Sequence, residues 1–135
     1  MIPVNMLNPR KIETQAAYEQ FKKKHAKDTK RLHVFDLSEE KIIKEFKHWV
    51  IIENRFPYDE MVATNHMLVS RRPIASHYES NEDEQAEYHT IIQTLCKEGF
   101  YDALIENFPK VRSVTKFAHT HLIVWHTTTH DHKGN

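Results

Sequence analysis

Two histidines, His119 and His121, stand one residue apart near the end of the chain. If the segment is extended, both imidazoles lie on one face of a strand, about 7 Å apart along it. Two rings at this spacing can engage one phosphate, with one attacking phosphorus and the other hydrogen-bonding the phosphoryl oxygens. The spacing is also compatible with a divalent metal site or with histidines that line a hydrated sheet face.

The element that must present these histidines is a strand over residues 113–126. Its residues fall into two alternating sets, as expected when successive side chains point to opposite faces. One face carries Phe117, His119, His121, Ile123 and Trp125, and the other carries Ala118, Thr120, Leu122 and Val124.

Helical patterns are predicted in four other places. Residues 13–28 are rich in helix formers with a weak apolar stripe, and residues 82–98 have an apolar face, an acidic start and Gly99 as the stop. A second helix is expected to begin at Ser38 and to carry Ile42, Ile43 and Phe46. A short helix is expected over residues 101–107.

Shorter apolar runs predict the remaining strands. They cover residues 32–35, residues 49–52 and residues 67–69, the last two ending in turns that contain Pro57 and Pro73. Helices and strands alternate without a strict βαβ rhythm. The sequence therefore predicts an α+β domain with a mainly antiparallel sheet and flanking helices.

Several of these segments resemble, in order, the core of the histidine-triad superfamily. A strand ends in the turn 54–57 (Asn-Arg-Phe-Pro), and 66–69 (His-Met-Leu-Val) begins a strand that leads to basic residues at 71–72. A helix and then the strand around 119–121 follow. The Asn-Arg-Phe-Pro turn is also similar to the galactose-1-phosphate uridylyltransferase branch. The resemblance covers residues 49–125, so we expect one domain over 1–126, with a core from about residue 47, N-terminal helices over 1–46 and a His-rich tail at 127–135.

The triad of the superfamily has three alternating histidines, and this strand has two. The resemblance therefore implies two possible registers. In the preferred register, Phe117, His119 and His121 match the three, which makes His119 the nucleophile and His121 a phosphate contact. The other register matches His119, His121 and Ile123, which makes His121 the nucleophile. The first register keeps a polar group at the third position.

The resemblance also implies residues that bind substrate. Asn54 matches the asparagine at the nucleotide-binding edge, and His66 matches a histidine at the rim of the pocket. A hydroxyl before the histidine strand usually meets the phosphate, and Ser113 and Thr115 flank that position. Lys116 is nearby and would offset phosphate charge.

The resemblance thus predicts a nucleotide-phosphate hydrolase or nucleotidyl transferase that forms a covalent nucleotidyl-histidine on His119, needs no cofactor or metal, and is a homodimer. A binding module that turns over slowly or not at all is the first alternative, because the triad is incomplete. A metal-binding protein that uses His119, His121 and the tail histidines His126, His130 and His132 is the second.

Composition narrows the class of protein. The 135 residues include 39% hydrophobic and 28% charged residues and have a formal net charge of +0, so no global field favours a nucleic-acid partner. The two glycines, Gly99 and Gly134, exclude glycine-rich phosphate loops. A single cysteine, Cys96, and the lack of an apolar run of about 20 residues favour a cytoplasmic protein that does not cross a membrane.

Overall fold

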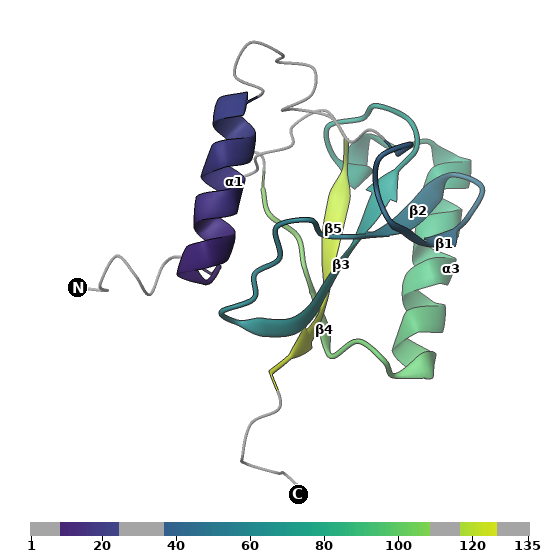
Figure 1. Ribbon diagram of the computed structural model, residues 1–135. Coiled ribbons are helices and arrows are strands. Elements are labelled where there is room, and N and C mark those ends of the chain that lie inside the picture. Colours follow the sequence, from purple (N-terminus) through teal and green to yellow (C-terminus); the bar gives the residue numbers. More distant parts are fainter. Residues whose placement is uncertain (1–8, 25–36, 109–116, 127–135) are drawn as a thin grey trace, which may run out of the picture.

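A five-stranded antiparallel sheet forms the centre of the protein (Figure 1). The computed structural model describes residues 9–24, 37–108 and 117–126. The strands lie in the order β1-β2-β3-β5-β4, and all four pairings are antiparallel. The strands are β1 (Ile42–Glu45), β2 (Trp49–Glu53), β3 (Val62–Ser70), β4 (Ala103–Ile105) and β5 (His119–Trp125). The helices are α1 (Ile12–Lys24), the 3₁₀ turn η2 (His77–Glu79) and α3 (Glu82–Glu98).

Helix α3 begins and ends at residues that satisfy its terminal backbone groups. Asn81 accepts a hydrogen bond from the Glu84 amide, and the Glu84 carboxylate accepts one from the Asn81 amide, so the two form a capping box. Gly99 ends the helix in the left-handed conformation at φ 74°, which a residue without a Cβ adopts at little cost. Two hydrogen bonds of 2.9 and 2.8 Å from Arg72 to Glu84 tie the end of β3 to this helix start.

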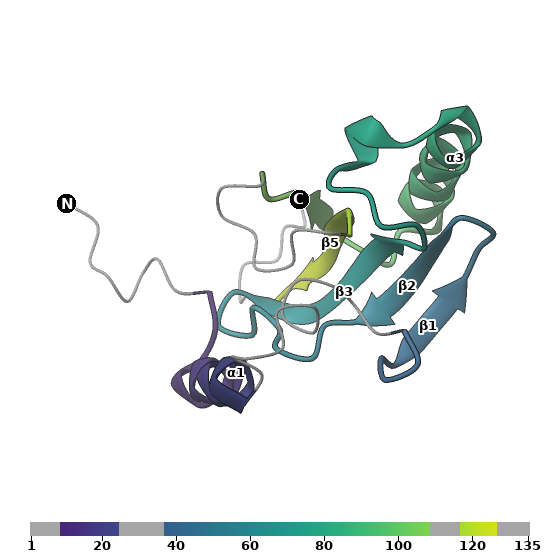
Figure 2. The same cartoon turned by 90° about the horizontal axis from the view of Figure 1, so that it is seen from above.

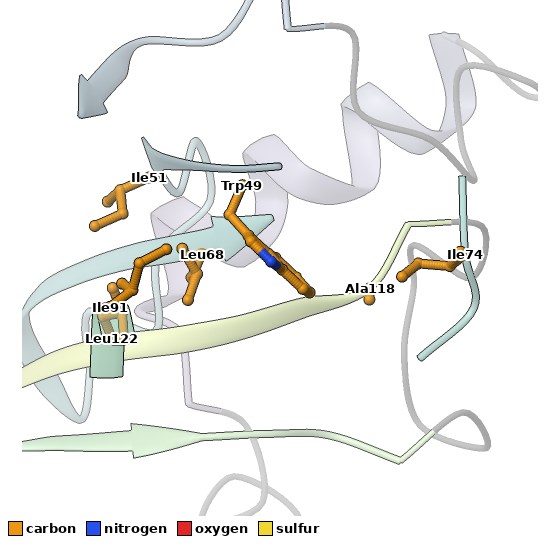
Figure 3. Close-up of a cluster of buried hydrophobic side chains, with 7 residues drawn as sticks. All are labelled: Trp49, Ile51, Leu68, Ile74, Ile91, Ala118 and Leu122. Carbon is orange, nitrogen blue, oxygen red and sulfur yellow. The ribbon is translucent and has the colours of Figure 1, made fainter. Parts of the chain in front are cut away.

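One face of the sheet packs against α3. One apolar stripe of α3 faces the sheet, and its residues recur at helical spacing: Tyr88, Ile91, Ile92 and Leu95. Trp49 is fully buried beneath them, and its indole nitrogen donates to the Glu84 carbonyl over 2.9 Å. Figure 3 shows the buried cluster that results, which consists of Trp49, Ile51, Leu68, Ile74, Ile91, Ala118 and Leu122.

The opposite face of the sheet carries a second apolar cluster and the two histidines. The buried members of this cluster are Val50, Ile52, Met67 and Val69, with Leu37 and Phe117 packed against them. Figure 2 shows α1 and α3 on opposite sides of the sheet. The histidine face is therefore the one turned away from α3.

Helix α1 is fastened to the loop that joins β2 to β3. The backbone amide of Lys11 and the hydroxyl of Thr14 both donate to the Asp59 carboxylate. Tyr18 and Phe21 both contact the ring of Phe56, with ring centroids 5.3 and 5.2 Å away. These contacts hold α1 beside the loop between β2 and β3.

The sequence predicted several of these elements correctly. The α+β class, the antiparallel sheet, the strand beginning at Trp49 and the helix over Glu82–Glu98 are confirmed. The first helix is confirmed over Ile12–Lys24, and the predicted strand at 67–69 is part of the longer β3. Strand β5 confirms the extended conformation from His119 onward. The predicted strand at 32–35 and the tail at 127–135 lie outside the described residues. None of the described helices combines the length and the apolar character needed to cross a bilayer.

Two predicted helices are wrong. The segment after Ser38 was expected to be helical, but Ile42–Glu45 is the edge strand β1, so helices do not fill residues 1–46. Its apolar pair suggested a helix stripe, whereas pairing with β2 imposes an extended backbone with a register shift between Ile42 and Lys44. The helix expected over 101–107 is instead strand β4, because Ala103–Ile105 pairs with β5.

Candidate active site

Strand β5 places both histidines on the same buried face. His119 lies opposite Val69 and His121 opposite Met67 on the neighbouring β3, so the pairing register fixes which way the imidazoles point. His119 is 8% exposed and His121 is 3% exposed. The rings meet edge to face with centroids 5.4 Å apart. The predicted pair is thus a contacting pair of imidazoles in a largely dry environment.

The first ring, His119, is anchored by the backbone just before its own strand. Its Nδ1 lies 3.1 Å from the carbonyl oxygen of Phe117. A carbonyl oxygen can only accept, so Nδ1 carries the proton in this hydrogen bond. In the neutral imidazole the lone pair then resides on Nε2, the atom that would attack an electrophile.

The second ring, His121, has a hydrogen-bond partner at each nitrogen. Its Nδ1 lies 3.1 Å from Nδ2 of Asn65, and its Nε2 lies 3.3 Å from the hydroxyl of Tyr58. The Tyr58 ring also stacks on the imidazole, with centroids 4.6 Å apart and an interplanar angle of 29°. The Tyr58 hydroxyl accepts a further hydrogen bond from Asn107 over 3.0 Å. Contacts at both ring nitrogens and at one ring face therefore fix the orientation of the His121 imidazole.

Burial controls the charge of this site. Removal from water is the largest of three causes that together lower the pKa of His121 from 6.5 to about 3, and the other two are the neighbouring His119 and the cation of Arg10. Arg10 lies over the Tyr58 ring, 5.0 Å from its centroid. Burial also raises the pKa of Tyr58. His121 is accordingly neutral, and Tyr58 keeps its proton, throughout the physiological pH range.

The lowered pKa of His121 predicts a pH dependence of stability. As pH falls below 6.5, His121 of the unfolded chain binds a proton, whereas the folded chain resists protonation down to about 3. The free energy of unfolding therefore falls across this window, by up to about 1.4 kcal/mol per pH unit for one such group.

Urea unfolding of wild type and of His121→Gln at about pH 7 and about pH 4.5 measures this effect. Because both proteins have the same carboxylates, the difference between them isolates the contribution of His121 to the pH dependence of stability. We expect the variant to lose less stability between the two pH values than wild type does. Equal losses in the two proteins would contradict a neutral buried His121. The exposed His89 provides the matched control, since His89→Gln should behave as wild type.

The other predicted site residues are only partly brought together. Asn54 is buried, and its amide nitrogen donates to Oδ1 of Asn65 over 3.0 Å. This hydrogen bond connects Asn54 to a neighbour of His121 and not to either imidazole. His66 lies on the α3 face, opposite Leu122, and bonds the Tyr101 hydroxyl over 2.6 Å. It is not brought together with the histidine pair. Ser113, Thr115 and Lys116 lie outside the described residues.

Two residues at the site were missed by reasoning from the sequence, Asn65 and Tyr58. Asn65 directly precedes His66, and strand alternation sends these neighbours to opposite faces. Its alternation with Met67 and Val69, which belong to the histidine face, was the signal that could have identified it. Tyr58 lies in the loop after Pro57, and no periodicity predicts where a loop side chain points.

Metal coordination was the second alternative for the pair. Within residues 9–24, 37–108 and 117–126, no three side chains of the metal-ligating types gather. His126 is exposed and bonds the Asp59 carbonyl oxygen over 2.7 Å, and the tail histidines His130 and His132 lie outside the described residues.

Comparison with solved structures finds a similar fold. A HIT (histidine triad) family hydrolase from Clostridium thermocellum aligns with a TM-score of 0.50 and 16% sequence identity, over 67% of this chain and 83% of that chain. A comparison of the sequence with family models gives no match, and neither does a comparison with curated proteins. The chain therefore has the HIT-like α+β fold, with its two contacting histidines on strand β5, between β3 and β4.

Proposed function

We propose that the protein hydrolyses or transfers nucleotide phosphates through a covalent nucleotidyl-histidine on His119. The observation that carries this proposal is the hydrogen bond from Nδ1 of His119 to the Phe117 carbonyl, which leaves the lone pair on Nε2. The fold, shared with a HIT family hydrolase, supports a phosphorylated substrate. The same hydrogen bond favours the register in which His119 is the central, nucleophilic residue, because it leaves the lone pair on Nε2 of His119.

The reaction would proceed in two displacements at phosphorus. Nε2 of His119 attacks the α-phosphorus, a phosphorus–nitrogen bond forms, and the bond to the leaving phosphate or alkoxide breaks with its electron pair. In the second step, a water or phosphate oxygen attacks the same phosphorus. The phosphorus–nitrogen bond breaks, the lone pair returns to Nε2, and the proton of the attacking water passes to solvent.

The neighbouring groups would make this attack easier. Burial of the pair limits the water that competes for phosphorus and strengthens electrostatic interactions within the site. His121, kept neutral by burial, adds no positive charge that would withdraw the lone pair of His119. The cation of Arg10 beside the Tyr58 ring lends the site a positive potential suited to a phosphate.

A binding module without turnover is the second candidate. It is favoured by Phe117, which packs against the apolar cluster where the triad resemblance expects a histidine. It is also favoured by His121, since both of its ring nitrogens already have partners inside the protein.

Two measurements on the same purified protein separate these candidates. Calorimetry with a nucleoside monophosphate tests binding, and release of monophosphate from a dinucleoside polyphosphate or a nucleoside phosphoramidate tests turnover. Binding with multiple turnovers would support the enzyme. Binding without release would support the module, and a lack of both binding and release would contradict both candidates.

A further inference from the structure

The orientation of the Asn65 side-chain amide is fixed by backbone groups at both of its ends. Its Oδ1 accepts a hydrogen bond of 3.0 Å from the backbone amide of Tyr58, and its Nδ2 donates one of 3.2 Å to the carbonyl oxygen of His66. A backbone N–H can only donate and a backbone carbonyl can only accept. The atom of Asn65 that faces His121 is therefore the NH₂ group, with its second hydrogen available for the imidazole.

This orientation determines where the proton of His121 lies. Nδ1 of His121 must accept from the Asn65 NH₂ group, so it carries no proton. The single proton of the neutral ring is then on Nε2, and it points at the Tyr58 oxygen. In this tautomer Nε2 has no lone pair in the ring plane, so it cannot attack phosphorus.

The two histidines are thus held in opposite tautomers. His119 donates through Nδ1 to the Phe117 carbonyl, and His121 accepts through Nδ1 from Asn65. We propose that Asn65 is a positioning residue that selects the nucleophile of the pair, because its NH₂ group holds His121 in the tautomer that cannot attack. This inference deepens the proposed function and rests on it, because a nucleophile is selected only if one of the two histidines attacks phosphorus. The tautomers themselves can be measured without any turnover.

The proposal depends on the amide at position 65 and not merely on its size. An aspartate has nearly the same shape but offers only acceptors when it is ionised. One of its oxygens would still accept from the Tyr58 amide, and the other would face Nδ1 of His121 and favour a proton there. Asn65→Asp should therefore reverse the tautomer of His121 or protonate both of its nitrogens.

The first test is the nitrogen NMR spectrum of the imidazoles in the wild-type protein at neutral pH. His119→Gln and His121→Gln variants assign the signals by their loss. We expect His121 to show a protonated Nε2 and an unprotonated Nδ1, and His119 to show the reverse. A His121 that carries its proton on Nδ1, or is doubly protonated, would overturn the proposal. This readout is independent of activity, so failure of the proposed function would not alter it.

The second test follows the titration of His121 in Asn65→Asp. We expect a proton to appear on Nδ1 and the titration midpoint to rise by about 1–3 pH units, as for a histidine that gains a carboxylate neighbour. Asn81→Asp is the matched control, because aspartate also caps a helix and position 81 lies at the start of α3. It should leave the titration unchanged. An unchanged titration in Asn65→Asp as well would overturn the proposal.

Tyr58→Phe keeps the aromatic stack and removes the hydroxyl, and so it tests the proposal even where a buried aspartate prevents folding. We expect Nδ1 of His121 to remain unprotonated in this variant, since Asn65 is intact. A shift of the proton to Nδ1 would overturn the proposal, because Tyr58 rather than Asn65 would then set the tautomer.

Discussion

His119→Ala is expected to reduce the turnover of a nucleotide substrate by on the order of 10⁴-fold or more, as the loss of a covalent nucleophile does in other enzymes. The reason is specific to one atom. Nε2 of His119 holds the attacking lone pair, whereas His121 presents a protonated Nε2 to Tyr58 and cannot take over. Initial rates at saturating substrate measure this effect directly.

The control for this loss must show that the fold survives. His89 lies exposed on α3, away from the histidine face, so His89→Ala should keep full activity. His119→Ala should retain the far-ultraviolet circular dichroism spectrum and a cooperative unfolding transition. A folded His119→Ala protein with wild-type turnover would contradict the assignment of the nucleophile.

The second large effect concerns stability and uses the two tryptophans of the chain. Trp49→Ala is expected to lower the free energy of unfolding by about 3–5 kcal/mol. Trp49 is 0% exposed, packs against Tyr88 with ring centroids 5.0 Å apart, and donates to the Glu84 carbonyl. Its removal leaves a cavity between the sheet and α3, within the cluster of buried side chains in Figure 3.

Trp125→Ala is the matched control, because the side chain of Trp125 is 43% exposed at the end of β5. Its loss should cost at most about 0.5 kcal/mol. Urea unfolding followed by circular dichroism compares both variants without relying on tryptophan fluorescence. Similar destabilisation by the two substitutions would contradict a core centred between the sheet and α3.

The elements that the sequence predicted correctly carry strong local signals. The helix Glu82–Glu98 has an apolar stripe, a capping residue and a terminal glycine that all agree. Strand β2 is a compact apolar run that is buried over its first four residues. By contrast, β1 and β4 are short edge strands of four and three residues, and only pairing with a neighbour makes them extended. Local propensity cannot supply that information.

The candidate site was predictable to a similar extent. Alternation along one strand was enough to place His119 and His121 on one face. Their separate roles could not be read in this way, because the tautomers depend on the Phe117 carbonyl and on Asn65, which comes from a different strand. The Tyr58 contact further requires the β2–β3 loop to fold back over β5. Such contacts join residues 63 positions apart in the chain and follow only from the tertiary fold.

The covalent intermediate is the central claim, and trapping it provides the most direct measurement. The protein is mixed briefly with a nucleoside phosphoramidate, quenched in base to preserve the phosphorus–nitrogen bond, and mapped by peptide mass spectrometry. We predict one nucleotidyl group per chain, attached to His119 and absent from His119→Ala. Turnover without any adduct, or an adduct on another residue, would contradict nucleophilic attack by His119.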